Sequence, residues 1–315
     1  MFAGPRNSET GAHLWADRFD GSLDEVFELQ DRVTASVVGA ITPRLDQAEM
    51  ARAQRKPIEN LDAYDCLLRG LDQFYRSTEE SEERARDLFY RAIDIDPHFA
   101  TPYGMATRCY TARKIEGRVI DREWEEAETR RLALQVQVLG SDDAVALCWA
   151  GFALAYVCRE YGIGSAMVDE ALSINPNLAG GWRCRGMISI HVGQHALAVE
   201  QLTRALRLSP VGPDGFGTEA SLSSAYFYQD RPEEALKWAG RALAHRSDSR
   251  LARRALVLAN VLAGNLGEAK KLVAELRELD PLLSITNIRN SIAGVQRPQD
   301  IDKYIAGMRL AGLPE

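Results

Sequence analysis

The sequence contains few cysteines, no long apolar run and fewer basic than acidic residues. Its five cysteines are odd in number and show neither CxxC nor CxxxC spacing, so we expect buried, reduced thiols rather than disulfides or a zinc site. The longest stretch without a charged residue, from Ala144 to Cys158, has fifteen residues, whereas a membrane-spanning helix needs ~20. A net charge of −7 disfavours nucleic acid and anionic lipid, because both are bound through Lys and Arg.

The sequence also lacks the marks of export and of common enzyme classes. Pro5, Arg6 and Glu9 lie where a signal peptide would have its apolar core, so we expect a cytoplasmic protein. No P-loop, GxSxG or HExxH motif occurs. The glycine-rich segment 212–217 follows a helix end instead of a strand, which favours a loop over a phosphate site. We therefore expect no enzyme activity, no cofactor and no metal.

Two further patterns suggest metal ligands at first sight. His191 and His195 have the i,i+4 spacing that suits a metal on one helix. Gly193 lies between them at an expected hairpin turn, which places them on different helices and favours two surface histidines. The acidic run 79–83 is expected to be a solvated helix amino terminus, where negative charge complements the helix dipole.

What the chain does contain is a short segment that recurs four times and ends in proline. The four copies are Ala92–Pro97, Ala171–Pro176, Ala205–Pro210 and Leu276–Pro281. Their prolines lie 79, 34 and 71 residues apart, and a unit of 34 residues accounts for these gaps when longer loops absorb the surplus. A period in this range is typical of stacked helical hairpins.

The clearest unit, residues 179–210, places small residues where two helices of a hairpin would approach each other, and large apolar residues between them. These positions, with the proline that would end the second helix, are Trp182, Gly186, Ala198, Leu202, Ala205 and Pro210. The unit resembles the tetratricopeptide repeat family. The same frame also fits residues 62–97, 100–142, 143–177, 216–248 and 250–281. The weakest of these is 100–142, matched through Tyr103, Tyr110, Ala127 and Leu134.

The resemblance implies an all-α fold, a right-handed superhelical solenoid of about six tetratricopeptide hairpins over residues 62–282. One such hairpin cannot bury enough apolar surface to be stable alone, so neighbouring hairpins must share a continuous core. Residues 283–315 are rich in polar side chains and are expected to form a capping pair of helices, because the terminal unit of a solenoid needs a polar outer face.

The first sixty residues differ from the rest. Residues 21–56 predict a long amphipathic helix that begins at a capping Ser22. The stretch Thr10–Gly21, followed by Val26–Asp31, resembles the close of the TolB-like domain, which precedes tetratricopeptide arms in many bacterial class III adenylate/guanylate cyclases and some winged-helix regulators. Residues 1–20 are expected to be a remnant of that domain. Met1–Arg6 stands where the catalytic or DNA-binding domain of those proteins would come first, so we expect a truncated or late-starting chain.

In the tetratricopeptide family, the first helix of each hairpin lines a concave wall. Carried onto this sequence, the wall positions of the family are Arg108, Tyr156, Arg183, Met187, His191, Phe227, Tyr228 and Arg254. Arginines with aromatic neighbours would suit an acidic peptide or a terminal carboxylate. Each of these residues could instead pack between hairpins or pair with a nearby glutamate.

The sequence therefore predicts a non-catalytic interaction scaffold that holds a peptide or a partner helix in its concave groove. The alternative is the regulatory carboxy-terminal arm of an adenylate/guanylate cyclase, or of a winged-helix transcriptional regulator, separated from its catalytic or DNA-binding domain. Neither the partner nor the oligomeric state follows from the sequence.

Overall fold

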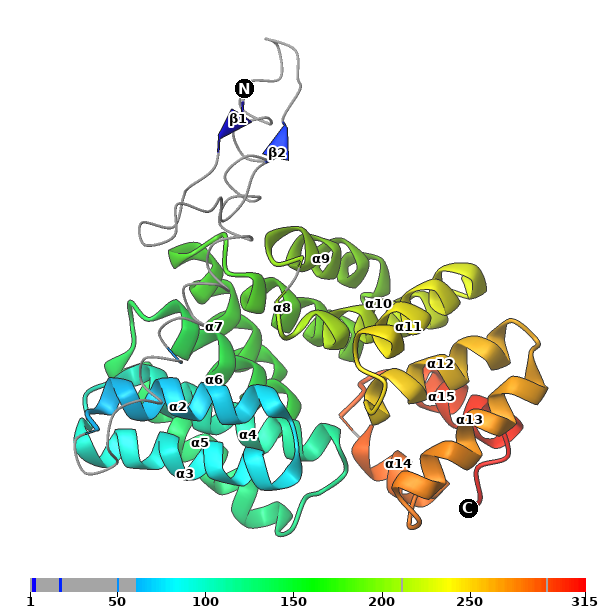
Figure 1. Cartoon of the computed structure of the whole chain (residues 1–315), viewed down its shortest axis with the longest axis horizontal. Helices are drawn as coiled ribbons and strands as arrows, with labels where there is room; N and C mark the ends of the chain where they lie inside the picture. Colours follow the sequence, from blue (N-terminus) through cyan, green and yellow to red (C-terminus); the bar gives the residue numbers. More distant parts are fainter. Residues whose placement is uncertain (1, 4–16, 19–49, 51–60, 211, 293) are drawn as a thin grey trace.

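A computed structural model describes residues 2–3, 17–18, 50, 61–210, 212–292 and 294–315 of the chain. The expectations for residues 1–20 and 21–56 therefore fall almost entirely outside the described residues. Within them, the two-residue strands β1 (Phe2–Ala3) and β2 (Asp17–Arg18) pair antiparallel. From residue 61 to the carboxyl terminus every regular element is an α-helix, which confirms the all-α class (Figure 1).

The helices after residue 61 pair into consecutive hairpins that stack side by side (Figure 1). The pairs are α2 (Ala63–Arg76) with α3 (Glu79–Ile95), α4 (Ala100–Ile115) with α5 (Arg122–Leu139), α6 (Ala144–Tyr156) with α7 (Tyr161–Ile174), α8 (Ala179–His191) with α9 (His195–Leu208), α10 (Gly215–Tyr228) with α11 (Pro232–His245), α12 (Arg250–Leu262) with α13 (Leu266–Leu279), and α14 (Ile285–Ser291) with α15 (Pro298–Leu310). Among these helices, none has the length and apolar composition that a bilayer crossing requires.

The recurring prolines mark helix ends. Each one lies two residues after the last residue of a second hairpin helix, since α3, α7, α9 and α13 end at Ile95, Ile174, Leu208 and Leu279. Proline has no backbone N–H and disfavours helical geometry in the residue before it, so the helix stops there. At the other end, α3 begins at a reciprocal cap in which Thr78 Oγ1 accepts from Ser81 N at 3.2 Å and Ser81 Oγ accepts from Thr78 N at 3.0 Å.

The small and large positions of the clearest unit pack as the sequence predicts. A side chain added at Gly186 on α8 would lie 2.6 Å from Leu202 Cγ on α9, so the two helices can approach this closely only around glycine. Leu202 and the neighbouring Ala198 and Ala205 are buried.

The frame predicted for residues 100–142 is wrong in its second helix, because the connection before α5 shifts the register. Leu134 is 57% exposed, and Leu132, Ala133 and Val136 fill the core instead.

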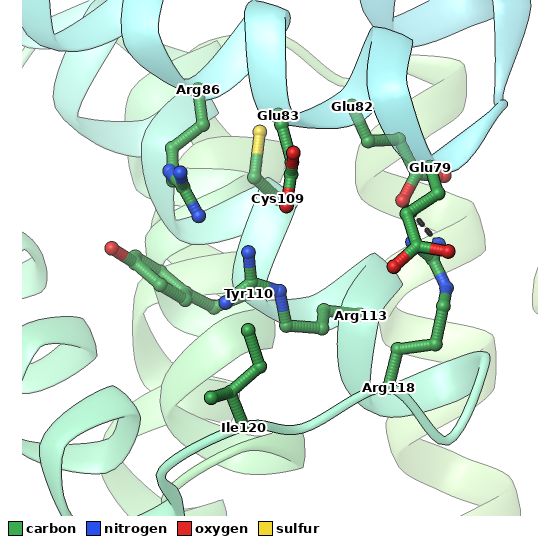
Figure 2. Close-up of a pocket in the computed structure, with 9 residues that line it drawn as sticks. All are labelled: Glu79, Glu82, Glu83, Arg86, Cys109, Tyr110, Arg113, Arg118 and Ile120. Carbon is green, nitrogen blue, oxygen red and sulfur yellow. Dashed lines mark hydrogen bonds and ion pairs between the residues drawn. The ribbon is translucent and has the colours of Figure 1, made fainter.

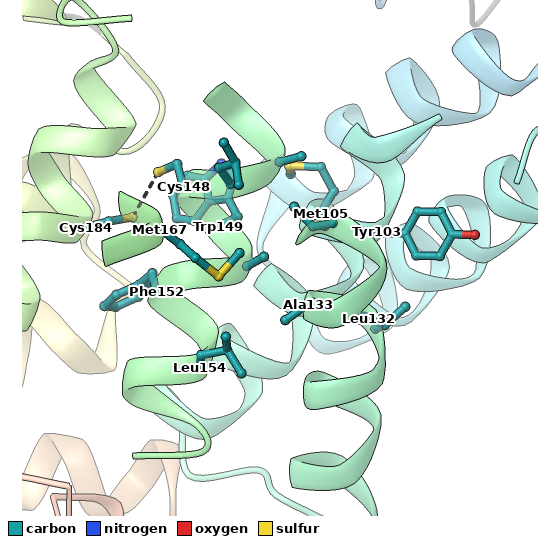
Figure 3. Close-up of a cluster of buried hydrophobic side chains, with 14 of the residues drawn as sticks. Tyr103, Met105, Leu132, Ala133, Cys148, Trp149, Phe152, Leu154, Met167 and Cys184 are labelled. Atoms are coloured by element: carbon teal, nitrogen blue, oxygen red, sulfur yellow. Dashed lines mark hydrogen bonds between the residues drawn. The ribbon is translucent and has the colours of Figure 1, made fainter. Parts of the chain in front are cut away.

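One apolar core runs from α2 to α8 without a break between hairpins. Figure 3 shows its centre, where Trp149 and Phe152 of α6 pack beside Met105 of α4 and Met167 of α7. All five cysteines are free and buried, as expected from the sequence, and the Sγ atoms of Cys148 and Cys184 lie 3.5 Å apart. Each hairpin completes the core of its neighbour, so a single hairpin would leave its apolar face exposed to water.

The last helix pair turns back over the array. Helix α15 lies beside α12 (Figure 1), and a side chain at Gly307 would come within 2.7 Å of Leu258 Cδ2. The segment between α14 and α15 reaches the turn after α8, where Gln296 N donates to His191 O at 2.8 Å and Arg297 Nη1 donates to Gly193 O at 3.2 Å. The pair therefore contacts several earlier hairpins in addition to the sixth.

Candidate functional site

The first helices of the hairpins form an inner wall that contains two cavities. The larger one, here called the groove cavity, has a volume of about 200 Å³. The smaller one, here called the phenolic cavity, has a volume of about 100 Å³. Ile115 and Leu251 line both cavities, so the two lie next to each other.

The residues predicted to line one concave wall divide between these cavities. Arg108 and Arg183 line the groove cavity. Five others line the phenolic cavity, namely Tyr156, Met187, His191, Tyr228 and Arg254. Phe227 lines neither cavity, since it is 3% exposed and packs in the core cluster of the last three hairpins. A binding role for any of the eight stays a prediction.

Arg108 is the most constrained side chain of the groove cavity. Its guanidinium carbon lies 3.9 Å from the ring centroid of Trp149 and 4.3 Å from that of Phe74. Its Nη2 donates to Asp214 Oδ1 at 2.5 Å, and Arg183 Nη1 lies 3.7 Å from the same oxygen. Burial alone would raise the pKa of the Asp214 carboxyl, but the two arginines outweigh this effect and lower it.

Asp214 is the residue of the groove cavity that the sequence did not single out. It lies in the glycine-rich segment 212–217, which we interpreted as a loop that absorbs extra residues. The only sequence feature that could have indicated Asp214 is that it is a single carboxylate in that loop. Its pairing with Arg108 could not be predicted, because the two residues are 106 positions apart in the sequence. The two arginines thus have an internal counter-ion, as the alternative reading of their role allowed.

The rim of the groove cavity carries balanced charge. Its lining includes five arginines and five carboxylates, which are Arg108, Arg118, Arg183, Arg246 and Arg250 against Glu79, Glu82, Glu116, Asp214 and Asp248. The cavity as a whole therefore attracts an acidic ligand no more strongly than a basic one.

A small pocket beside this rim is lined by charged side chains that form ion pairs. Figure 2 shows Arg113 and Arg118 facing the acidic start of α3, with Arg86 on α3 itself and Tyr110 on the opposite side of the pocket. Arg118 pairs with Glu82, a buried residue whose pKa is raised mainly by burial. The expectation of a fully solvated acidic run is therefore wrong at Glu82. With a volume of about 20 Å³, the pocket has room for little more than water.

The two histidines of the i,i+4 pair lie on different helices, as predicted, but the expectation that both are surface residues is wrong, because His195 is buried and His191 is half-buried. Burial lowers the pKa of His191 to about 4. The contact of its Nδ1 with Met187 O, at 2.7 Å, would raise this pKa, but burial has the larger effect. His195 is 7% exposed, and its Nε2 lies 2.9 Å from Asp300 Oδ2 on α15. The last helix pair covers the turn between α8 and α9, which buries His195 and leaves His191 half-buried. In the described part of the chain, no group of three His, Cys, Asp or Glu side chains is placed to hold a metal.

Two long-range hydrogen bonds, here called the clasp, join the two ends of the array across the inner wall. Arg246 Nη2 donates to Ser77 O at 3.1 Å, and Arg254 Nη2 donates to Ile115 O at 2.7 Å. They connect the first two hairpins to the end of the fifth and the start of the sixth. The second bond joins Ile115, which lines both cavities, to Arg254, which lines the phenolic cavity.

Comparison with known proteins supports the fold and gives a partial relative. No family model matches the chain. "Putative adenylate cyclase 3" of Rhizobium meliloti (strain 1021) is 34% identical over 94 residues, which are 30% of this chain and 16% of that protein. A chain of the APC/C hetero-tetramer Cut9–Hcn1 is 15% identical, with a TM-score of 0.55 over 87% of this chain and 49% of its own length.

TTC0263, a thermophilic tetratricopeptide protein of Thermus thermophilus, is 16% identical, with a TM-score of 0.48 over 62% of this chain and 98% of its own length. The stacked hairpins, their proline-terminated repeats and the likeness to the Cut9–Hcn1 chain show that this chain has the tetratricopeptide solenoid fold. The sequence match to a cyclase agrees with the predicted resemblance to a cyclase arm.

Proposed function

We propose that this protein is a non-catalytic interaction scaffold and that its groove cavity holds an extended peptide or a helix of a partner protein. The observation that supports the proposal is the groove cavity itself, an opening of about 200 Å³ between the first hairpins and the loops before α10 and α12. A solenoid of this fold acts through the surface that it presents, and a concave wall can contact a partner along several hairpins at once.

The walls of the groove cavity have the composition of a binding hot spot. Tyr75 and Phe216 contribute partly exposed aromatic surface, and Arg108 is held in place by two rings and a carboxylate. Tyr and Arg are enriched among the residues that dominate known interfaces, and side chains that are already immobilised lose little entropy on binding. The fold neighbour noted above belongs to a hetero-tetramer with Hcn1, which is consistent with an assembly role for such arrays.

A peptide selection tests this proposal directly. We would select binders from a displayed library of random peptides and measure Kd for the wild type and for the double variant Arg183→Gln/Phe216→Ser. Both residues are partly exposed in the groove cavity, and loss of both should weaken binding about tenfold or more.

The matched control is Arg204→Gln. Arg204 also stacks on an indole, 4.1 Å from the centroid of Trp182, but it is exposed and does not line the groove cavity. Its loss should leave Kd unchanged. A selection that yields no binder, or binders whose Kd is the same for the double variant, would contradict the groove assignment.

A second function is favoured by the match to the Rhizobium meliloti protein. Under this proposal the chain is the regulatory arm of an adenylate or guanylate cyclase, or of a winged-helix regulator. It works when it is joined to the catalytic or DNA-binding domain. Sequencing the DNA upstream of the Met1 codon tests it. An in-frame cyclase or winged-helix domain supports the arm, and an in-frame stop codon directly before Met1 counts against it. A cytoplasmic location stays a prediction under both proposals.

A further inference from the structure

Arg254 is a buried cation without a counter-ion among the described residues. It is 9% exposed, its Nη2 donates to the backbone oxygen of Ile115, and its Nε has no partner. No described carboxylate lies within 4.0 Å of its guanidinium. Three other arginines of the inner wall have one: the buried Arg108 pairs with Asp214, and the partly buried Arg113 and Arg118 pair with Glu125 and Glu82. Because buried charges are almost always paired, Arg254 marks a place for an anion.

The phenolic cavity lies directly beside this guanidinium, and its lining contains no acidic residue. Burial lowers the pKa of His191 to about 4, so its ring is neutral near pH 7 and Arg254 is the charged group of the lining. Glu116 is close enough to affect the pKa of Tyr156, but it lines the groove cavity and not the phenolic cavity. The phenolic cavity therefore carries a net positive charge.

Three phenol hydroxyls also line this cavity and have no hydrogen-bond partner within the described chain. They belong to Tyr156 of α6, Tyr228 of α10 and Tyr304 of α15. Burial raises the pKa of all three, so they stay protonated and can donate. Arg254 opposes this shift in Tyr156 and Tyr304, which places its charge near both hydroxyls. Each tyrosine is partly exposed, so the cavity is reached from solvent.

The remaining lining is mostly apolar, with Ile190, Leu258, Ile292 and Val295. It also includes Ser221, Ser224 and Ser291, whose hydroxyl hydrogens are used by backbone oxygens of their own helices. A volume of about 100 Å³ corresponds to roughly three water molecules in the liquid. An inorganic phosphate would leave several oxygens against these apolar side chains without partners, at the cost of an unsatisfied polar group. A carboxylate with a short hydrocarbon tail matches both parts of the lining: its oxygens suit Arg254 and the phenol hydroxyls, and its tail suits the apolar side chains.

We propose that the phenolic cavity is a binding site for a small free carboxylate, whose oxygens accept from Arg254 and the tyrosine hydroxyls while its tail packs against the apolar side. Ile292, Val295 and Tyr304 belong to the last helix pair, and Arg254 belongs to the sixth hairpin. The bound anion therefore links the folded-back pair to the array and holds it in place. This site is separate from the groove cavity and does not depend on the peptide-binding proposal.

Thermal unfolding of the full chain tests the site with butyrate as the probe and butyramide, its neutral analogue, as the control ligand at equal ionic strength. Butyrate at about one hundred times its Kd should raise Tm by ~4 °C, and butyramide should leave it unchanged. Arg254→Met should abolish the rise. Arg253→Met is the matched variant, because Arg253 pairs with Glu275 at 3.3 Å and does not line the cavity, so it should keep the rise.

If Arg254→Met does not fold, Tyr304→Phe provides the second variant. It removes one hydroxyl and should raise the Kd for butyrate about tenfold, because hydrogen bonds to charged groups are the stronger ones. Two further probes distinguish other sources of the same chemistry: phosphate, and a short peptide with either a free or an amidated carboxyl terminus. A Tm rise with phosphate or with the free-terminus peptide but not with butyrate would overturn the proposal, as would an equal rise in Arg254→Met.

Discussion

At the scale of single residues, the inner wall depends on how each buried charge is compensated. Asp214 compensates Arg108, whose side chain is 5% exposed and enclosed by two aromatic rings. The sequence placed Arg108 and Arg183 on the inner wall through the offsets of the tetratricopeptide frame. It could not supply their counter-ion, because Asp214 reaches them only after the fifth hairpin has stacked on the array.

Replacing Asp214 by Asn tests this compensation. The change leaves the Arg108 guanidinium buried without a carboxylate, and we expect a loss of about 2 kcal/mol in the free energy of unfolding. Urea unfolding followed by circular dichroism would measure it. The matched control is Asp169→Asn, which removes an exposed partner of Arg185 at 2.7 Å and should cost less than ~1 kcal/mol. Equal losses in the two variants would contradict the role assigned to Asp214.

The half-buried ring of His191 makes the free energy of unfolding depend on pH. Its pKa is about 4 in the folded protein and near 6.5 in the unfolded chain, so the unfolded chain binds a proton between these values and the folded chain does not. Protonation therefore favours unfolding, and this contribution to stability falls as the pH drops below about 6.5. Lys114 faces the ring and adds to the effect, while the bond to Met187 O opposes it.

We expect the wild type to lose about 2 kcal/mol more stability than His191→Gln between pH 7 and pH 5, after the shared loss from carboxylates is subtracted. Urea unfolding at both pH values gives this difference. His98→Gln, at an exposed position, should behave as the wild type does. If His191→Gln showed the full pH dependence of the wild type, the ring would not be the group responsible.

At the scale of elements, local signals predicted more than long-range ones. The proline positions gave the ends of four helices, and the small residues of 179–210 gave the close approach of α8 and α9. These features depend on neighbours within one hairpin. The frame failed in α5, where the connection before Arg122 shifts the register and Leu134 faces solvent. The return of α15 over α10 and α12 was also not predicted, because no local pattern encodes contacts with residues tens of positions earlier.

The packing of α15 can be tested at Gly307. A methyl group there would lie 2.7 Å from Leu258 Cδ2, so Gly307→Ala should lower the free energy of unfolding by about 1–3 kcal/mol and speed amide exchange in α15. Gly240→Ala on α11 is the control, because nothing lies within 4 Å of the added group. It should stabilise the protein by about 0.5–1 kcal/mol through helix propensity alone. Stabilisation by both changes would show that α15 does not pack against α12 as described.

At the scale of the whole molecule, the clasp and the folded-back pair divide the inner wall. The sequence predicted one groove along all hairpins, since the family frame treats every first helix alike. The structure contains two cavities, because Arg254 reaches Ile115 across 139 positions and the last pair covers the turns near the phenolic cavity. Both features arise from contacts between the ends of the array, which depend on superhelical curvature. Curvature is the sum of small rotations between hairpins, and the repeat pattern does not specify it residue by residue.

The groove cavity is what remains open between these closing contacts, and our account of the protein depends on its being a partner-binding surface. The most direct measurement is the Kd of one library-selected peptide for three proteins: the wild type, Arg183→Gln/Phe216→Ser and Arg204→Gln. We predict binding about tenfold weaker or more for the first variant and wild-type affinity for the second. Equal affinity for all three, with each protein folded, would contradict the account.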